Sequence, residues 1–162
     1  MTGAGSVVFV GPGKGQSFRI AADRFLSKQN RASAREGFAV IEYVGAPGET
    51  GPPMHRHRSF EEAWFVLDGR VAFKTQRRVV TAKRGAYILV PRRVPHTFSV
   101  LGSSPARWLG IFSPGRYVGL VEELGAIVPR HGAPDPAAIA ALFEKYDSEI
   151  VIDRAPALRP PP

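Results

Sequence analysis

The 162-residue sequence contains no cysteine, which excludes disulfides, thiolate metal ligands and cysteine nucleophiles. It also lacks long hydrophobic runs, since no stretch approaches the roughly 18 consecutive apolar residues of a membrane-spanning helix. The opening segment, MTGAGSVVFVGPGKG, shows no basic stretch that leads into an apolar run, so we expect no signal peptide. Together these absences predict a cytoplasmic protein that makes no contact with a membrane.

The net charge is +8, and the excess of positive charge lies in the middle of the chain. Residues 51–100 contain ten lysines and arginines but only three acidic residues. Clustered cations can bind phosphate backbones, yet no helix-turn-helix, zinc-finger or RNA-binding motif accompanies them. We therefore do not expect nucleic-acid binding. The remaining interpretations are solvated strand and turn faces, or a positive rim that attracts an anionic small substrate.

Short strands joined by turns are the secondary structure that the composition favours. Glycine (17) and proline (15) are frequent and dispersed along the chain. Asp68-Gly69 lies between two apolar runs and predicts a hairpin, because glycine tolerates the positive φ of such turns. Evenly spaced strands favour a sandwich or barrel. We expect strands near residues 6–10, 17–20, 37–44, 54–58, 61–67, 70–75, 78–83, 86–91, 96–101 and 106–113.

Helical signals are confined to the last third of the chain. Residues 117–125 suit a short helix, and Asp135-Pro136 supplies an N-cap and a first-turn proline for another. Apolar residues then recur at helical spacing, so we expect this helix to pack on the outside of the strands. The stripe consists of Ile139, Leu142, Phe143 and Tyr146. The prediction is a single all-β domain over 1–152 with one or two short helices at its C-terminal end, and a proline-rich tail over 153–162.

Three of the four histidines form a pattern typical of metal sites. His55 and His57 are separated by one residue, so on a strand both imidazoles project from the same face. Glu62 follows closely, and His96 lies further along the chain. Three imidazoles and a carboxylate form a nitrogen and oxygen donor set that suits Fe, Mn, Ni, Co, Cu or Zn. Four protein ligands leave an octahedral ion open positions for a substrate, which is typical of an active site.

Each of these residues also has an ordinary structural interpretation. A single His-x-His pair on a strand is more often a surface or ion-paired feature, and a lone glutamate is usually solvated. The combination at these spacings is what favours a metal. Glu61 is the rival carboxylate, although the distance to Gly69 favours Glu62. His131 lies outside the pattern, and we expect it in an exposed loop.

Strand alternation also identifies a candidate substrate pocket. Trp64 and Val66 have the parity of Glu62, and Phe98 and Val100 have the parity of His96. Tyr87, Trp108 and Phe112 are further candidates whose parity is not anchored. Apolar, aromatic walls around a metal suit a planar aromatic or polyketide-like molecule.

Two segments resemble the two sequence motifs of the cupin superfamily. PPMHRHRSFEEAWFVLDG is similar to the first motif, G-x5-H-x-H-x(3,4)-E-x6-G, and GAYILVPRRVPHTFSV to the second, G-x5-P-x-G-x2-H-x3-N. The positions that match are His55, His57, Glu62, Gly69, Gly85, Pro91 and His96. Glu49, Arg93 and Val100 depart from the motifs, and none of them is a ligand position. The chain looks most like single-domain bacterial cupins similar to quercetin 2,3-dioxygenase.

The resemblance implies a cupin jelly-roll barrel with a divalent transition metal on His55, His57, Glu62 and His96. It implies a dioxygenase-like reaction on an enolisable aromatic or polyketide-like small molecule, in which Glu62 accepts the substrate proton. Two alternatives remain open: a non-redox metal enzyme (isomerase, lyase or polyketide cyclase) and a ligand-binding cupin without catalysis. Because edge strands need cover, we also expect a homodimer, in which segment 6–20 could be the exchanged strand.

Overall fold

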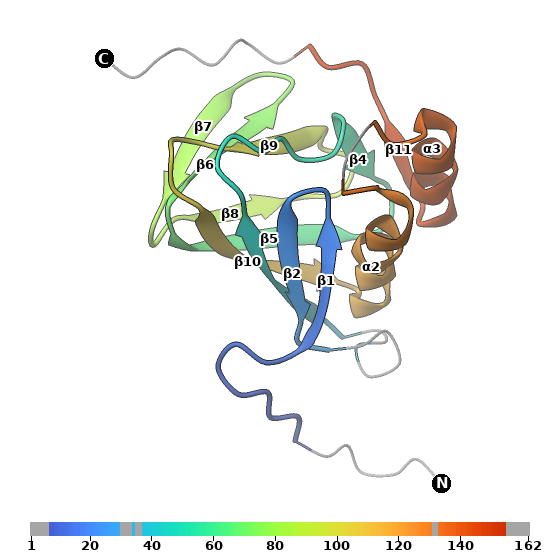
Figure 1. Ribbon diagram of the computed structural model, residues 1–162. Coiled ribbons are helices and arrows are strands. Elements are labelled where there is room, and N and C mark those ends of the chain that lie inside the picture. Colours follow the sequence, from blue (N-terminus) through green and yellow to red (C-terminus); the bar gives the residue numbers. More distant parts are fainter. Residues whose placement is uncertain (1–6, 30–33, 35–36, 131–132, 155–162) are drawn as a thin grey trace, which may run out of the picture.

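Two antiparallel sheets face each other in the computed structural model, which describes residues 7–29, 34, 37–130 and 133–154 (Figure 1). One sheet has six strands in the order β1-β2-β3-β10-β5-β8. They are β1 (Gln16–Ile20), β2 (Asp23–Ser27), β3 (Ala39–Gly45), β10 (Ala106–Ser113), β5 (Glu61–Asp68) and β8 (Tyr87–Val90). The other sheet has five strands in the order β11-β4-β9-β6-β7. They are β11 (Ser148–Ile150), β4 (His55–His57), β9 (His96–Val100), β6 (Arg70–Thr75) and β7 (Val79–Lys83).

The helices whose bounds are described follow β10 and only β11 comes after them, so the all-β prediction with short C-terminal helices is confirmed. They are η1 (Gly115–Tyr117), α2 (Val118–Ile127) and α3 (Pro136–Lys145). The Asp135 side chain accepts a hydrogen bond from the backbone N–H of Ala137 at 2.9 Å and so caps α3. Helices α2 and α3 lie outside the sheets, at one end of the barrel (Figure 1). None of the helices in the described ranges is long and apolar enough to cross a membrane.

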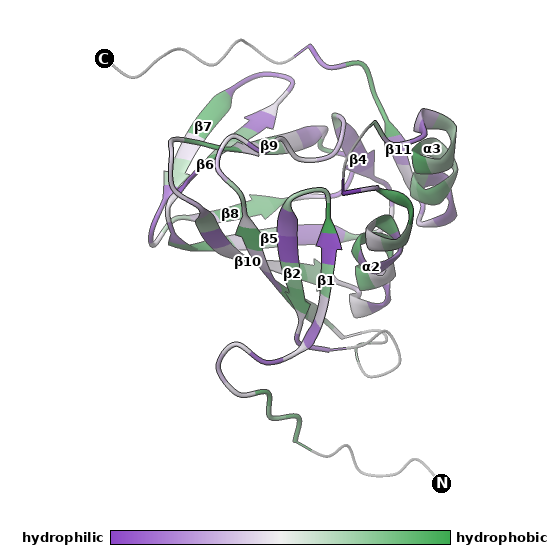
Figure 2. Ribbon diagram, viewed as in Figure 1, coloured by the Kyte–Doolittle hydropathy of each residue, from purple (hydrophilic) through white to green (hydrophobic). Residues whose placement is uncertain are grey.

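Aromatic rings from both sheets make up the core. Trp64 and Trp108 of the six-stranded sheet stack with ring centroids 5.7 Å apart, and Phe98 of the other sheet meets Trp64 edge-on at 5.0 Å. Tyr43 stacks on Trp108 at 5.0 Å. A side chain at Gly110 would come within 2.6 Å of the Tyr43 ring, so a larger residue here would have to displace that ring. Along the strands, hydrophobic and hydrophilic residues are interspersed, as expected for strands with one buried face (Figure 2).

The turn at Asp68-Gly69 is present, but the predicted hairpin is wrong. Gly69 has a φ of +72°, and a Cβ there would lie 2.6 Å from the Cα of Ala106. However, β5 pairs with β8 and β10, whereas β6 pairs with β7 and β9. The turn therefore transfers the chain from one sheet to the other instead of joining two paired strands.

Other strand predictions also differ from the structure. The strand expected at 6–10 is wrong for the described part of that segment, because residues 7–10 pair with no strand and Val7 and Phe9 are 95% and 87% exposed. Strands β2 and β11 were not predicted: every residue of β2 except Arg24 is buried, so the strand does not alternate clearly, and β11 has only three residues, Ser-Glu-Ile. His131 and residues 155–162 lie outside the described residues.

Candidate metal centre

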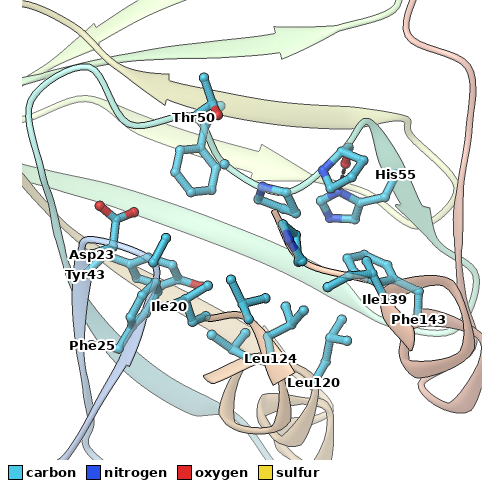
Figure 3. Close-up of a pocket in the computed structure, with 18 of the residues that line it drawn as sticks. Ile20, Asp23, Phe25, Tyr43, Thr50, His55, Leu120, Leu124, Ile139 and Phe143 are labelled. Atoms are coloured by element: carbon cyan, nitrogen blue, oxygen red, sulfur yellow. Dashed lines mark hydrogen bonds between the residues drawn. The ribbon is translucent and has the colours of Figure 1, made fainter. Parts of the chain in front are cut away.

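A cavity of about 660 Å³ lies between the sheets and the two helices (Figure 3). Its walls combine strand residues with residues of the C-terminal helices. The strands contribute the aromatic side chains Phe25, Tyr43, Trp64, Phe98 and Phe112, and the helices contribute Leu120, Val121, Leu124, Ile139 and Phe143. The cavity wall is therefore mostly apolar, and a large part of it comes from the segment after residue 113.

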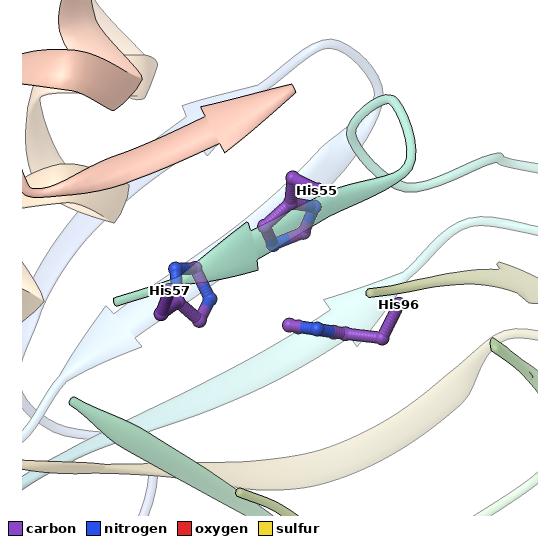
Figure 4. Close-up of side chains that lie close together, drawn as sticks. All are labelled: His55, His57 and His96. Carbon is purple, nitrogen blue, oxygen red and sulfur yellow. The ribbon is translucent and has the colours of Figure 1, made fainter. Parts of the chain in front are cut away.

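Three buried histidines lie together at one end of this cavity. His55 and His57 both point inward from β4, and His96 is the first residue of β9, where it pairs directly with His55 (Figure 4). Potential ligand atoms of the three imidazoles all lie within 4.8 Å of one another. Glu62 reaches the group from β5 in the opposite sheet. Its Oε2 atom lies 3.6 Å from Nε2 of His57 and 3.4 Å from Nε2 of His96.

Backbone carbonyls set the tautomers of two of the imidazoles. Nδ1 of His55 lies 2.9 Å from the carbonyl oxygen of Pro53, and Nδ1 of His96 lies 3.0 Å from that of Val94. A carbonyl oxygen only accepts hydrogen bonds, so Nδ1 must carry the proton in both rings. The Nε2 lone pairs are thus left free, as a metal ligand requires.

The third imidazole is oriented by a side chain from the C-terminal segment. Nδ1 of His57 lies 2.8 Å from Oγ of Ser148, which is fully buried on β11. The Ser148 hydroxyl donates its own proton to the carbonyl oxygen of Tyr146 at 3.1 Å. Its oxygen must therefore accept the Nδ1 proton of His57, which leaves the Nε2 lone pair of His57 free as well.

The charge states of these groups suit a cation. Burial lowers the pKa of His55 well below its usual range, and burial lowers the pKa of His57 to about 4 although Glu62 opposes the shift. Burial alone would raise the pKa of Glu62, but the neighbouring imidazoles of His57 and His96 outweigh it and hold that pKa well below its usual range. At neutral pH His55 and His57 are therefore neutral and Glu62 is ionised, which are the protonation states that metal ligands need.

The donor set fits a divalent transition ion. Nε2 of His57 and Nε2 of His96 are buried, and the described residues provide no hydrogen-bond partner for either. Leaving a buried polar atom unpaired costs about 1–3 kcal/mol, and one cation between the two rings would satisfy both. Glu62 is held in place by Trp64, whose Nε1–H donates to Oε1 of the carboxylate at 2.5 Å.

The structure separates the predicted pocket residues into three groups. Trp64, Phe98 and Phe112 line the cavity. Val66, Val100 and Trp108 point inward but lie deeper in the core, where they pack against other side chains and not against the cavity. The prediction for Tyr87 is wrong, because this side chain is 61% exposed and does not line the cavity. Tyr87 pairs with Phe65 of β5, and both side chains face outward.

The basic excess of the middle segment does not reach the cavity. None of the ten lysines and arginines of residues 51–100 is among its lining residues. Arg56 and Arg58 form ion pairs with Glu149 next to the centre, on the outer side of β4 and β11. The charged lining residues in the described part of the chain are Asp23, Glu49, Glu62 and Arg130.

An inward-facing His-x-His pair, a glutamate and a third histidine inside a two-sheet barrel define a class of metal-binding β-barrel proteins. Residues 42–112 match the family model described as "Cupin domain". Residues 42–112, somewhat less than half of the chain, are therefore similar to cupin domains. No curated protein matches the sequence.

Solved structures with the same fold come from several bacteria. KdgF from Halomonas sp. has a TM-score of 0.59 and 16% identity, and the match covers 70% of this chain and 96% of that chain. An RmlC-like cupin from Shewanella frigidimarina NCIMB 400 has a TM-score of 0.57 and 18% identity, with 68% and 94% covered. The polyketide cyclase RemF from Streptomyces resistomycificus has a TM-score of 0.58 and 19% identity, with 67% and 80% covered. At these identities the matches show the fold alone.

Proposed function

We propose that the protein is a metal-dependent enzyme that removes a proton from an enolisable, largely apolar small molecule. The observation that carries this proposal is the convergence of three buried imidazoles and one carboxylate at the end of a cavity, with two imidazole nitrogens unpaired. His55, His57, His96 and Glu62 would hold the ion. Bound there, a divalent transition metal would act as a Lewis acid and lower the pKa of a proton next to a substrate oxygen.

Glu62 is the residue we propose to accept the proton. Its Oε1 atom is held by the indole N–H of Trp64, whereas Oε2 faces the imidazoles at the cavity end. Glu62 would first be partly displaced from the ion, and its Oε2 atom would then be free to act as a general base. The aromatic wall formed by Trp64, Phe98 and Phe112 keeps bulk water away from the resulting carbanion.

Two reactions share this proton abstraction. In a dioxygenase-like reaction, as the resemblance to quercetin 2,3-dioxygenase implies, dioxygen takes the electron pair of the carbanion and both of its atoms enter the products as a C–C bond breaks. In a non-redox reaction the same electron pair is used for isomerisation, elimination or ring closure without oxygen. The cupin fold also occurs in a polyketide cyclase and in the nucleoside dehydratase Pac13, which supports the non-redox alternative.

Metal analysis combined with hydrogen–deuterium exchange tests the proposal without a known substrate. We expect protein purified without added metal to contain a divalent transition ion, and His57→Ala to lose it. The intact protein should also speed the exchange of the α-protons of a slowly exchanging aryl ketone such as α-tetralone in D₂O, and Glu62→Gln should not. Oxygen uptake during turnover would favour the dioxygenase, whereas unchanged turnover under anaerobic conditions would favour the non-redox reaction. Metal-free protein without exchange activity would indicate a ligand-binding cupin instead.

The homodimer and the cytoplasmic location remain predictions. Strand β1 pairs with β2 of the same chain, so the proposed exchange of segment 6–20 is not needed to complete the sheet. Phe65, Tyr87 and Leu89 are exposed on adjacent strands of the outer face, which supports contact between faces as the more suitable route to a dimer. Light scattering coupled to gel filtration measures the oligomeric state directly.

A further inference from the structure

The end of the cavity away from the histidines is polar. Figure 3 shows Asp23 and Tyr43 together at that end, with Thr50 above them, whereas His55 lies at the other end beside Ile139 and Phe143. Asp23 lies on β2 and Tyr43 on β3, so neighbouring strands of one sheet bring the two side chains together. Neither residue belongs to the candidate metal centre.

Asp23 is a buried carboxylate without a cation. It is 6% exposed, and its Oδ1 atom accepts a hydrogen bond from the backbone N–H of Ala46 at 2.8 Å. Among the described residues nothing bonds to its other oxygen, Oδ2, and no lysine or arginine pairs with it. Glu42, the next buried acid on the neighbouring strand, provides the contrast, since it is paired with both Lys28 and Arg107.

The surroundings leave Asp23 able to accept a hydrogen bond from a ligand. Burial is the main reason that its pKa rises to about 6, with the nearby Glu49 adding to the shift and the Ala46 N–H opposing it. A buried carboxylate without a partner is costly, and here the free oxygen belongs to a residue that lines the cavity. A donor group on a bound molecule would supply the missing partner.

Tyr43 adds a second polar atom at the same end. Its ring is fixed by stacking on Trp108 at 5.0 Å and by an edge contact with Phe25 at 4.7 Å. The described residues provide no hydrogen-bond partner for its hydroxyl, although the side chain is only 5% exposed. Burial, together with the charges of Glu62 and Asp23, raises the pKa of Tyr43 well above its usual range. The hydroxyl therefore stays neutral and can both donate and accept.

We propose that Asp23, assisted by the Tyr43 hydroxyl, is a specificity site that binds a hydrogen-bond-donating group, an amine or a hydroxyl, on the end of the substrate remote from the metal. This inference rests on the proposed function and narrows its substrate class. The substrate would have an oxygen ligand at one end, an apolar middle along the aromatic and helical walls, and a donor at the other end. A carboxylate or phosphate placed beside Asp23 would be repelled by the charges of Asp23 and Glu49.

Bifunctional probes test the two ends of the cavity separately. Alkyl hydroxamates bind metals through the hydroxamate, and their tails can end in an amine, a hydroxyl or a methyl group over a series of lengths. Binding of each probe is measured by calorimetry to the metal-loaded full-length protein. At the matching length we expect the amine and the hydroxyl to bind about 10- to 100-fold more tightly than the methyl, which is the usual gain of a buried hydrogen bond to a charged group. Alkylamines without the hydroxamate are tested in parallel.

Asp23→Asn is the decisive variant, because an asparagine oxygen can still accept from Ala46 while the charge is lost. We expect it to abolish the preference for the amine and to leave the methyl probe unaffected. Glu49→Gln is the matched control: it removes the neighbouring carboxylate of the same wall, and the preference should persist. Equal binding of all three tails to the wild-type protein at every length would overturn the inference even if the variant does not fold, and so would a preference that Asp23→Asn retains. If no hydroxamate binds but the alkylamines still depend on Asp23, the metal proposal fails and the Asp23 site stands.

Discussion

Replacing Ser148 by alanine should weaken metal binding about 10- to 100-fold. In the wild-type protein the Ser148 oxygen accepts the Nδ1 proton of His57 and so keeps the Nε2 lone pair directed at the centre. Without the hydroxyl, a buried Nδ1–H is left unpaired, or the proton moves to Nε2, where Oε2 of Glu62 lies 3.6 Å away. A metal can bind Nε2 only while the proton is on Nδ1, where it no longer has a hydrogen-bond partner. This reduces the free energy of metal binding by about 1–3 kcal/mol.

Competition with a chromogenic chelator measures the affinity of each variant for Zn²⁺. Ser99→Ala is the matched control, since Ser99 is also buried, lies on β9 near His96, and has a hydroxyl for which the described residues provide no partner. We expect Ser99→Ala to bind Zn²⁺ like the wild-type protein. The reasoning is refuted if Ser148→Ala keeps its affinity to within about twofold, or if the two variants lose affinity equally.

Three further variants, and Arg92→Gly as a control, test the fold and the electrostatics by thermal or urea unfolding. Arg93 occupies the left-handed region with a φ of +66°, so Arg93→Gly should stabilise the protein by about 0.5–1 kcal/mol, whereas Arg92→Gly should destabilise it. The pKa of Asp23 is raised from 3.8 to about 6 in the folded protein. The contribution of Asp23 to the free energy of unfolding is therefore highest below pH 3.8, where Asp23 is protonated in both states, and it falls as the pH rises through 6 and the buried carboxylate ionises. After discounting for solvent screening, Asp23→Asn should gain about 1–2 kcal/mol at pH 8 and nothing at low pH. Gly110→Ala should cost about 1–3 kcal/mol, because its Cβ would meet the ring of Tyr43.

The relation between the candidate ligands could be predicted because it depends on local geometry. Two residues that are two apart on a strand share a face wherever the strand lies, which is why His55 and His57 point the same way. Glu62 could be preferred over Glu61 from its spacing to Gly69. Tyr87 shows the limit of the method, since its strand lacked an anchored parity and a shift by one residue reverses the face.

The elements that the sequence did not reveal depend on long-range pairing. Strand β11 has only three residues, Ser148–Ile150, and is extended because it pairs with β4. No local signal relates Ser148 to His57, which is 91 residues away. Likewise, β2 shows no clear alternation because all of its residues except Arg24 are buried, so the buried Asp23 could not be distinguished from a surface residue.

Strands β2 and β11 lie outside the segment that matches the family model, so their contribution to the site is particular to this chain. All four candidate ligands lie within residues 42–112, which match the cupin family model. Pro53, Val94 and Trp64, which orient three of the ligands, also lie in this segment. Other parts of the site come from outside it: Ser148 from β11, Asp23 from β2, and part of the apolar wall from α2 and α3. A metal centre held by the shared part can support several chemistries, because the ion supplies the same polarisation whatever is bound. We therefore expect the flanking segments to contribute to the choice of substrate, and the variants at Asp23 and Ser148 address those segments directly.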